Sequence, residues 1–198
     1  PPGLPWSTAP LFVYTLGMSL AVAILMGSGF FRDALDEIVE ISFSQSNRQH
    51  ATLVFTEELA ESVLKDVAGL PGVLQVEGTQ FVPVRLQNGP RSKHVSIEAR
   101  RPGPDLSRIV DAARRTVNPP ETGIILSDRL AAQLEVLPGD IVEVAFLTGR
   151  RETIEVEVAR TVTQFIGLGA YMDLDGLSAL LRQSPRISLA NVTLDGAE

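Results

Sequence analysis

The sequence contains no cysteine, only two histidines and few aromatic residues, which make up 6% of its 198 residues. Without cysteine the chain can form no disulfide, no thiolate nucleophile and no cysteine-ligated metal site. An excess of positive charge is also missing, since the formal net charge is −7. A nucleic-acid-binding protein would carry a basic stripe that neutralises phosphates. These absences exclude thiol chemistry and argue against a nucleic-acid partner.

The sequence also lacks the motifs that carry catalysis or nucleotide binding, such as HExxH, CxxC, the EF-hand loop and the P-loop. His50 and His94 stand far apart in polar stretches, and we interpret both as surface side chains. The glycines of residues 167–169 are typical of a turn, and Asp173 and Asp175 of a helix cap. The sequence therefore predicts no catalytic residue, no metal site and no cofactor, so a membrane-tethered enzyme is the least favoured function.

The most prominent feature that is present is an uncharged apolar run of 21 residues, Leu11–Phe31. At about 1.5 Å per residue, a helix of this length spans roughly 30 Å, the thickness of the hydrocarbon core of a bilayer. Small residues at Gly17, Ala21 and Gly27 predict a face on which a second helix packs closely. The run predicts a transmembrane helix, preceded by a short flank over residues 1–10.

Two other interpretations of this run are open. A signal peptide would have a basic N-terminal region and a shorter apolar core, but the first ten residues contain no Lys or Arg. A buried helix of a soluble protein would rarely lack a polar stripe over such a length. The missing basic flank also leaves the orientation in the membrane open.

Residues 32–43 contain no Gly or Pro and continue the helical pattern. Leu35, Ile38 and Val39 share one face, while acidic residues occupy the others. We expect one continuous helix over residues 11–43 that leaves the membrane and becomes a stiff connection to the next domain. A separate surface helix with no mechanical role is the alternative.

After residue 50 the pattern changes to short strands and short helices, which predicts an α+β fold with mostly antiparallel pairing. The Asn88-Gly89 pair favours a hairpin turn, because such turns require positive φ. The expected elements are a strand over 51–55, a helix capped by Thr56 and ended by Pro71-Gly72, strands over 73–77, 81–87 and 92–99, a helix over 105–115, a strand over 123–126, a short helix capped by Ser127, strands over 141–147 and 153–161, a helix over 175–181 and a strand over 187–194.

Several short motifs in this stretch occur in a recognisable order. They are Leu70-Pro71-Gly72-Val73 followed by Val76-Glu77, then Gly123-Ile124-Ile125-Leu126-Ser127, then Pro138-Gly139-Asp140, and finally the segment Phe165–Arg182. Their order and spacing resemble the FtsX/MacB-type permease family of ABC transporters, and the resemblance covers the chain from about Leu16 onward.

The resemblance implies a MacB-like extracytoplasmic domain over residues 44–198, with a porter-like βαβ part and an inserted, mostly antiparallel β subdomain over about 86–160. It also implies a bacterial inner-membrane location with the folded domain on the periplasmic side. The partners would be a separate ATP-binding subunit, the remainder of the permease, and hydrophobic or lipidated cargo. The chain departs from the family in lacking a basic flank before the helix and in ending before further membrane helices, so we expect it to be a fragment.

The function implied is mechanical: the domain would transmit motion, driven by ATP hydrolysis in the other subunit, to extract or export lipoproteins, lipids or peptides. An alternative is an anchored regulatory module that recruits an extracytoplasmic partner, such as an activator of cell-wall hydrolases. Four apolar residues crowd a glycine-containing loop and predict a partner or cargo contact. They are Phe165, Ile166, Leu168 and Tyr171. Burial between two subdomains is the competing interpretation of this loop.

Overall fold

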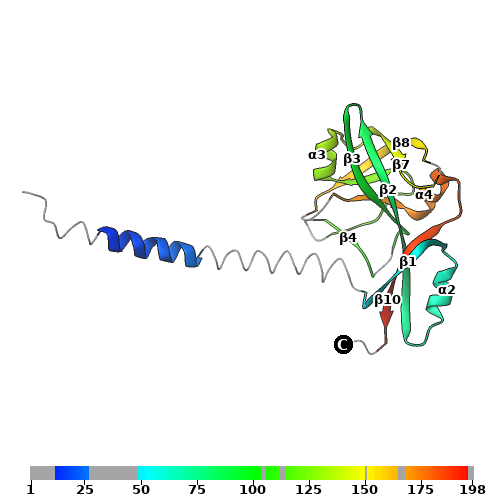
Figure 1. The fold of residues 1–198 in the computed structure, drawn as a ribbon, viewed down its shortest axis with the longest axis horizontal. Coiled ribbons are helices and arrows are strands. Elements are labelled where there is room, and N and C mark those ends of the chain that lie inside the picture. Colours follow the sequence, from blue (N-terminus) through cyan, green and yellow to red (C-terminus); the bar gives the residue numbers. More distant parts are fainter. Residues whose placement is uncertain are drawn as a thin grey trace, which may run out of the picture. The chain divides into compact units, whose positions relative to one another are not determined.

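The computed structural model describes residues 12–26, 49–103, 106–111, 115–149, 151–164 and 168–195. The chain divides into two compact units, Pro1–Ser42 and Phe43–Glu198. In the first unit, residues 12–26 form an α-helix, drawn in blue in Figure 1, whose side chains are exposed. No helix within the described residues is long and apolar enough to cross a membrane. Leu11 and residues 27–31 of the apolar run lie outside the described residues.

The second unit mixes many strands with three short helices in its described residues, which confirms the α+β part of the prediction. In chain order the elements are β1 (Ala51–Ala60), α2 (Val63–Ala68), β2 (Val73–Asn88), β3 (Arg91–Arg100), β4 (Ile109–Val110), β5 (Thr116–Val117), β6 (Ile124–Ser127), α3 (Asp128–Leu134), β7 (Ile141–Phe146), β8 (Thr153–Val162), β9 (Ala170–Asp173), α4 (Leu174–Leu181) and β10 (Arg186–Leu194).

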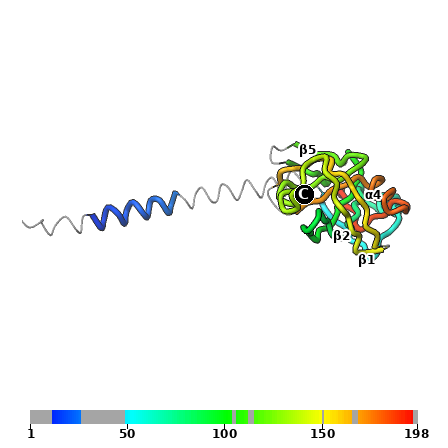
Figure 2. The backbone as a smooth tube through the Cα atoms, turned by 90° about the horizontal axis from the view of Figure 1, so that it is seen from above, coloured from blue at the N-terminus to red at the C-terminus, as the bar shows by residue number. Residues whose placement is uncertain are grey.

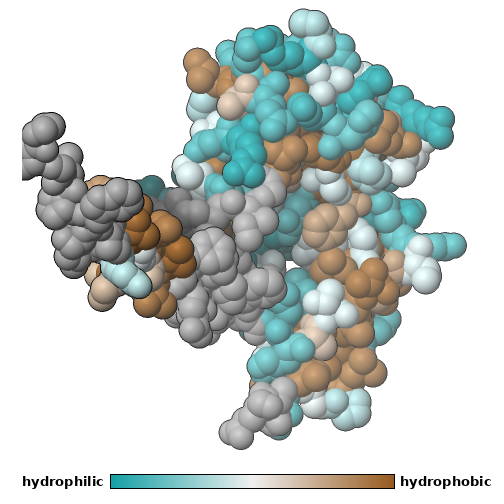
Figure 3. Space-filling view, turned by 60° about the vertical axis from the view of Figure 1, so that its left-hand side comes forward, coloured by the Kyte–Doolittle hydropathy of each residue, from teal (hydrophilic) through white to brown (hydrophobic). Residues whose placement is uncertain are grey.

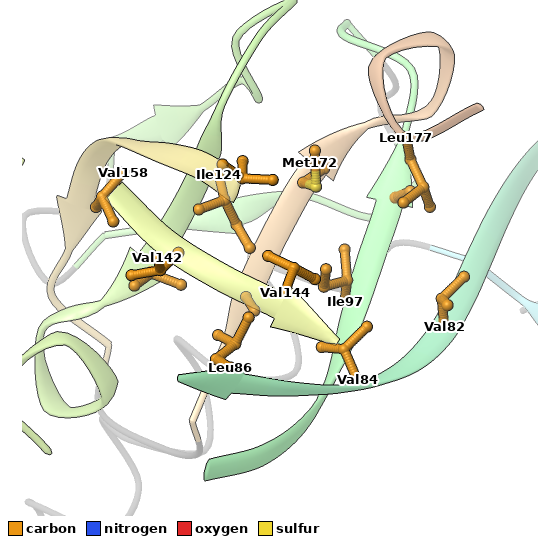
Figure 4. Packing of buried hydrophobic residues seen from close by; sticks show 14 of the residues in the cluster. Val82, Val84, Leu86, Ile97, Ile124, Val142, Val144, Val158, Met172 and Leu177 are labelled. Atoms are coloured by element: carbon orange, nitrogen blue, oxygen red, sulfur yellow. The ribbon is translucent and has the colours of Figure 1, made fainter. Parts of the chain in front are cut away.

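Six of these strands close into a ring. The order of pairing is β2, β3, β9, β6, β8 and β7, and β7 then pairs back with β2. The pairs β3–β9 and β6–β8 are parallel, and the other four are antiparallel. Val82, Val84 and Leu86 alternate along β2 and point inward, where they are buried to 3%, 0% and 0% exposure. Figure 4 shows these side chains meeting those of the other ring strands in the main hydrophobic core.

A three-stranded part extends from the ring, because β2 is 16 residues long and serves both regions. Residues 73–79 of β2 pair with β10, and β10 pairs on its other side with β1. The strand β10 therefore lies between the two strands of the expected βαβ unit. Helix α2 packs closely here: a Cβ atom added to Gly78 would lie 2.7 Å from Cγ2 of Ile187 and 2.9 Å from Cδ1 of Leu64. Figure 1 shows this part below the ring.

The prediction that a helix begins after Thr56 is wrong about the starting residue. Strand β1 continues to Ala60, and α2 begins only at Val63, with Ser62 in the cap position. The reason is tertiary pairing: Leu59 and Ala60 pair with β10 after an irregularity in the register. This pairing overrides the helix-favouring acidic residues of the segment.

The helix expected over residues 105–115 is also wrong. Ile109 and Val110 form β4, which pairs with β5 in a small separate ribbon. The Asp111 carboxylate accepts hydrogen bonds from the backbone N–H of Arg115 at 2.8 Å and from its Nε at 3.0 Å. Such a side chain favours a turn over a helix. In the view of Figure 2, β5 lies on the opposite side of the folded unit from β1. Residues 104–105 and 112–114 are outside the described residues.

The hairpin predicted at Asn88-Gly89 is confirmed with a shift of one residue, and the strands expected over 141–147 and 153–161 form a second hairpin. Asn88 pairs with Arg91, so the turn residues are Gly89, with φ of 54°, and Pro90. Asn88 instead donates its Nδ2 to the carbonyl oxygen of Leu134 at 3.0 Å, which ties the hairpin to α3. The second hairpin pairs β7 with β8, and the turn before it places Gly139 at φ of 95°.

Candidate functional site

The chain enters and leaves the folded unit at one place, which we call the root (residues 49–51, 70–74 and 192–195). Ala51 pairs with Val192, and the backbone N–H of His50 donates to the Val192 carbonyl oxygen at 3.0 Å. The N–H of Leu194 donates to Nδ1 of His50 at 3.1 Å, so this exposed histidine links the start of β1 to the end of β10. The N–H of Asp195 donates to the carbonyl oxygen of Gly72 at 2.7 Å. First strand, last strand and the α2–β2 turn therefore meet.

The three-stranded part carries apolar side chains on its surface. Leu70 and Leu74 at the root are 51% and 66% exposed, and Val54 on β1 is 76% exposed. Figure 3 shows hydrophobic surface over the lower region of the domain, where Figure 1 places α2, β1 and β10. Exposed apolar patches of this kind mark contacts with a partner or a lipid surface.

A charged cluster links the three-stranded part to the ring. Arg101 donates Nε and Nη2 to the two carboxylate oxygens of Glu61 at 2.6 and 2.8 Å, and Nη1 to Oδ2 of Asp175 at 2.5 Å. These hydrogen bonds, first to Glu61 and then to Asp175, raise the pKa of Arg101 above its ordinary value. The cluster connects the residue after β3 with the β1–α2 connection and the first turn of α4.

The helix caps predicted at Ser127 and Asp173 are found, with different bonding, whereas Thr56 lies within β1. Asp173 caps α4, since its Oδ2 accepts from the N–H groups of Asp175 and Gly176 at 2.9 and 3.0 Å. Ser127 occupies the cap position of α3 without a capping hydrogen bond. Its Oγ accepts from the N–H of Gly169 at 3.1 Å, which joins β6 to the segment before β9.

The predicted contact loop is described only in part. Phe165 and Ile166 lie outside the described residues. Leu168 is half-buried against the main core, and Tyr171 packs against a second cluster. Burial raises the pKa of the Tyr171 hydroxyl, although a hydrogen bond with Gln164 at 2.7 Å acts in the opposite direction. The contact role of the loop stays a prediction, and Leu168 and Tyr171 also hold the loop to the core.

The predicted packing face of the N-terminal helix is also described in part. Gly17 and Ala21 fall within the helix over residues 12–26, and a Cβ atom at Gly17 would meet nothing within 4 Å. Gly27 lies outside the described residues. Their role in helix packing stays a prediction.

A cleft with a volume of about 600 Å³ opens where the ring meets the three-stranded part. We call it the junction cleft, and its lining comes from β1, β2, the β7–β8 connection and the end of α4. Its most unusual residue is Gln80 of β2, which is fully buried. Sequence reasoning missed this residue, because one polar residue in an alternating strand gives no sign of whether it finds a partner.

The described residues do not bring metal-ligating side chains or the two histidines together. No group of three or more His, Asp or Glu side chains there could hold a metal ion. His50 directly precedes β1, and His94 lies on β3, in a different part of the fold. Neither is brought to the junction cleft.

Comparison with known proteins identifies the fold. No family model and no curated protein matches the sequence. The structure is similar to the extracellular domain of the noncanonic ABC-type transporter YknZ from Gram-positive bacteria, with a TM-score of 0.51 and 16% identity over 74% of this chain and 83% of that one. It is also matched to the periplasmic region of MacB from Actinobacillus actinomycetemcomitans, with a TM-score of 0.46 and 12% identity over 73% of each chain. The likeness to the YknZ domain concerns the fold alone, and it confirms the type of fold predicted for the second unit.

Proposed function

We propose that this chain is part of an ABC-transporter permease, with one transmembrane helix followed by an extracytoplasmic domain. The observation that carries the proposal is the root, where the entering strand β1 and the leaving strand β10 are paired neighbours. A domain with adjacent ends can be inserted between two membrane helices without distorting either. The similarity in fold to the extracellular domain of YknZ, an ABC-type transporter, supports an extracytoplasmic position for the domain.

The membrane anchor would be the apolar run Leu11–Phe31, of which residues 12–26 are helical. We infer that Gly17, Ala21 and Gly27 form the face against which another helix of the permease packs. The helix would continue to residue 43 and join the folded domain over 44–198. Within that domain, residues 86–160 would be the inserted subdomain.

The mechanism would be the transmission of motion. Strand β2 runs from the root into the ring, and its 16 residues reach about 50 Å if fully extended. Because one strand belongs to both regions, a displacement at the root is carried to the ring by covalent structure. The Arg101 cluster braces the same junction. ATP hydrolysis would take place in a separate ATP-binding subunit, and the cargo would be a lipoprotein, lipid or peptide.

This proposal can be tested in the intact transporter with its ATP-binding subunit in a membrane. The variant Ile38→Pro interrupts the expected helical connection, because proline removes a helix hydrogen bond and clashes with the preceding turn. We expect cargo release to fall at least tenfold while ATP hydrolysis continues. Ile38→Ala, which keeps a helix-compatible backbone, is the matched control. Unchanged cargo release in Ile38→Pro would contradict the proposed transmission.

A regulatory module that recruits an extracytoplasmic protein is the second candidate. It is favoured by β1, whose outer edge pairs with no strand in the described residues and which exposes Val54. Such an edge can accept a strand of another protein. The two functions differ in what controls ATP hydrolysis: cargo would stimulate a transporter, and a soluble protein partner would stimulate a regulator.

A further inference from the structure

We propose that the junction cleft is a binding site for a short peptide segment with an apolar centre and charges of both signs. The site goes beyond the transport function, because it would exist whether or not the chain belongs to a transporter. Its position is set by β2. Strand β10 pairs with β2 as far as Thr79, and β7 pairs with it from Val84 onward, so neither reaches residues 80–83. The cleft opens in this interval.

The first argument is the side chain of Gln80. It follows the inward-facing alternation of Val82, Val84 and Leu86, and it is 0% exposed. Neither its Nε2 nor its Oε1 has a hydrogen-bond partner. Buried amides normally find partners, and an unsatisfied one is unfavourable. A group that both donates and accepts would satisfy both atoms, and the peptide bond is such a group.

The second argument is the backbone of the rim. Within the described residues, three non-glycine residues have positive φ, and two of them, Arg151 at 47° and Arg182 at 51°, line this cleft. Arg182 occupies the C-cap position of α4, where glycine is strongly favoured. Non-glycine residues in sparsely populated backbone conformations cluster at functional sites. Both residues therefore line the cleft from backbone conformations that cost local conformational energy.

The third argument is charge. The cleft is lined by two acids, Glu58 and Glu152, and by Arg151 and Arg182, and none of these four forms an ion pair within the described residues. Equal numbers of acids and bases do not favour a simple anion or a metal ion. They favour an occupant that carries both signs and is close to neutral.

The walls and the strand edge define the occupant further. Val82, Phe146 and Leu181 supply apolar walls. Backbone groups along this edge of β2 already have hydrogen-bond partners. The N–H of Phe81 donates to Oγ of Ser188 at 2.7 Å, and the carbonyl oxygen of Pro83 accepts from the N–H of Leu147 at 3.1 Å. The peptide would thus contact side chains and not extend the sheet. It would reach Gln80 by displacing the side chains that cover its amide.

The experiment uses the full chain in a non-ionic detergent and four fluorescently labelled, capped tetrapeptides. Two of them, DLLK and KLLD, carry both charges around an apolar centre; DSSK lacks the apolar centre and ALLA lacks the charges. Fluorescence anisotropy should show at least tenfold tighter binding for one of the first pair than for either control peptide. Binding of all four with equal affinity, or of none, overturns the proposal.

Two sets of variants locate the site. Gln80→Leu should weaken binding at least tenfold, while Gln75→Leu, the same change outside the cleft on the same strand, should leave it unchanged. Arg151→Gly and Arg182→Gly should each weaken binding about tenfold without lowering the melting temperature. Glu135→Gly relieves the third positive φ outside the cleft and should have no effect on binding. Full binding by Gln80→Leu together with both arginine variants would overturn the site.

Competition identifies the chemistry of the ligand. Unlabelled peptide should displace the probe, whereas inorganic phosphate and vesicles of phosphatidylglycerol should not displace it at concentrations a hundredfold above that of the peptide. Displacement by phosphate or by vesicles would show that the ligand is an anion or a lipid headgroup and not a peptide, and it would contradict the proposal.

Discussion

The ring and the three-stranded part share strand β2, but they differ in how well their apolar side chains are buried. In the ring, every strand has two neighbours, and residues such as Leu86, Ile97 and Ile124 are 0% exposed. In the three-stranded part, β1 is an edge, and Val54 and Leu74 are 76% and 66% exposed. A closed ring has no free edge to satisfy and can bury its core alone. The three-stranded part leaves apolar surface that another molecule can cover.

This contrast assigns different roles to the two regions. The ring buries its core within its own strands. The three-stranded part holds the root, where the first and last strands pair, and its exposed apolar side chains make it the region that we propose contacts another molecule. The Arg101 cluster and the junction cleft lie where the two regions meet.

The largest expected effect compares one substitution in the two regions. Leu86→Ala should lower the free energy of unfolding by about 2–5 kcal/mol, because it removes a fully buried side chain and leaves a cavity. Leu74→Ala should change it by less than about 0.5 kcal/mol, because that side chain is largely exposed. Urea unfolding of the full chain measures both. Equal losses would show that the surface of the three-stranded part is already covered within the chain.

The next effect tests how tightly α2 is packed. Gly78→Ala should destabilise the fold by about 1–3 kcal/mol, because the new Cβ would lie within 3 Å of Ile187 and Leu64 side-chain atoms. Gly69→Ala is the control, since its Cβ would meet nothing nearer than 3.4 Å. Thermal unfolding distinguishes them. A neutral result for Gly78→Ala would mean that α2 is only loosely attached.

A smaller effect concerns the brace between the regions. Arg101→Met removes both ion pairs and should cost about 1 kcal/mol, since partly exposed pairs contribute roughly 0.2–1 kcal/mol each. The loss should shrink in 1 M salt, which screens exposed charges. Arg160→Met on the exposed face of β8 is the control. A salt-independent loss would contradict an electrostatic origin.

The smallest effect depends on pH. The pKa of Tyr171 is raised above its ordinary value of 10.0 chiefly by burial, so the folded protein holds this proton more tightly than the unfolded chain. The resulting stability is complete below about pH 10 and is lost as the pH rises towards the folded-state value. The difference in melting temperature between the parent and Tyr171→Phe should be constant from pH 7 to 9 and change above pH 10. A constant difference to pH 11 would contradict the burial.

The features that the sequence predicted are those encoded by neighbouring residues. The Asn88-Gly89 pair predicted the hairpin of β2 and β3, and the caps at Ser127 and Asp173 marked the starts of two helices. Each of these signals is read within a few residues of the element that it specifies.

The features that were missed depend on residues far away in the chain. Strand β1 extends to Ala60 because it pairs with β10, more than 100 positions later. Leu106 and Ile109 have the spacing of one helix face, but Ile109 pairs with Val117 in another strand, and the Asp111 turn follows it. The closing of the ring by β7 on β2 and the unsatisfied amide of Gln80 have no local signal at all.

The central claim is that the folded domain is held outside the membrane by the N-terminal helix. The absence of cysteine makes a direct test possible, since a single introduced thiol has no background. Ser92→Cys, exposed on β3, should react with a membrane-impermeant maleimide on intact spheroplasts as fully as after lysis. Ser178→Cys, buried in α4 at 3% exposure, should react only after denaturation. Labelling of Ser92→Cys only after lysis would place the domain on the cytoplasmic side and contradict the account.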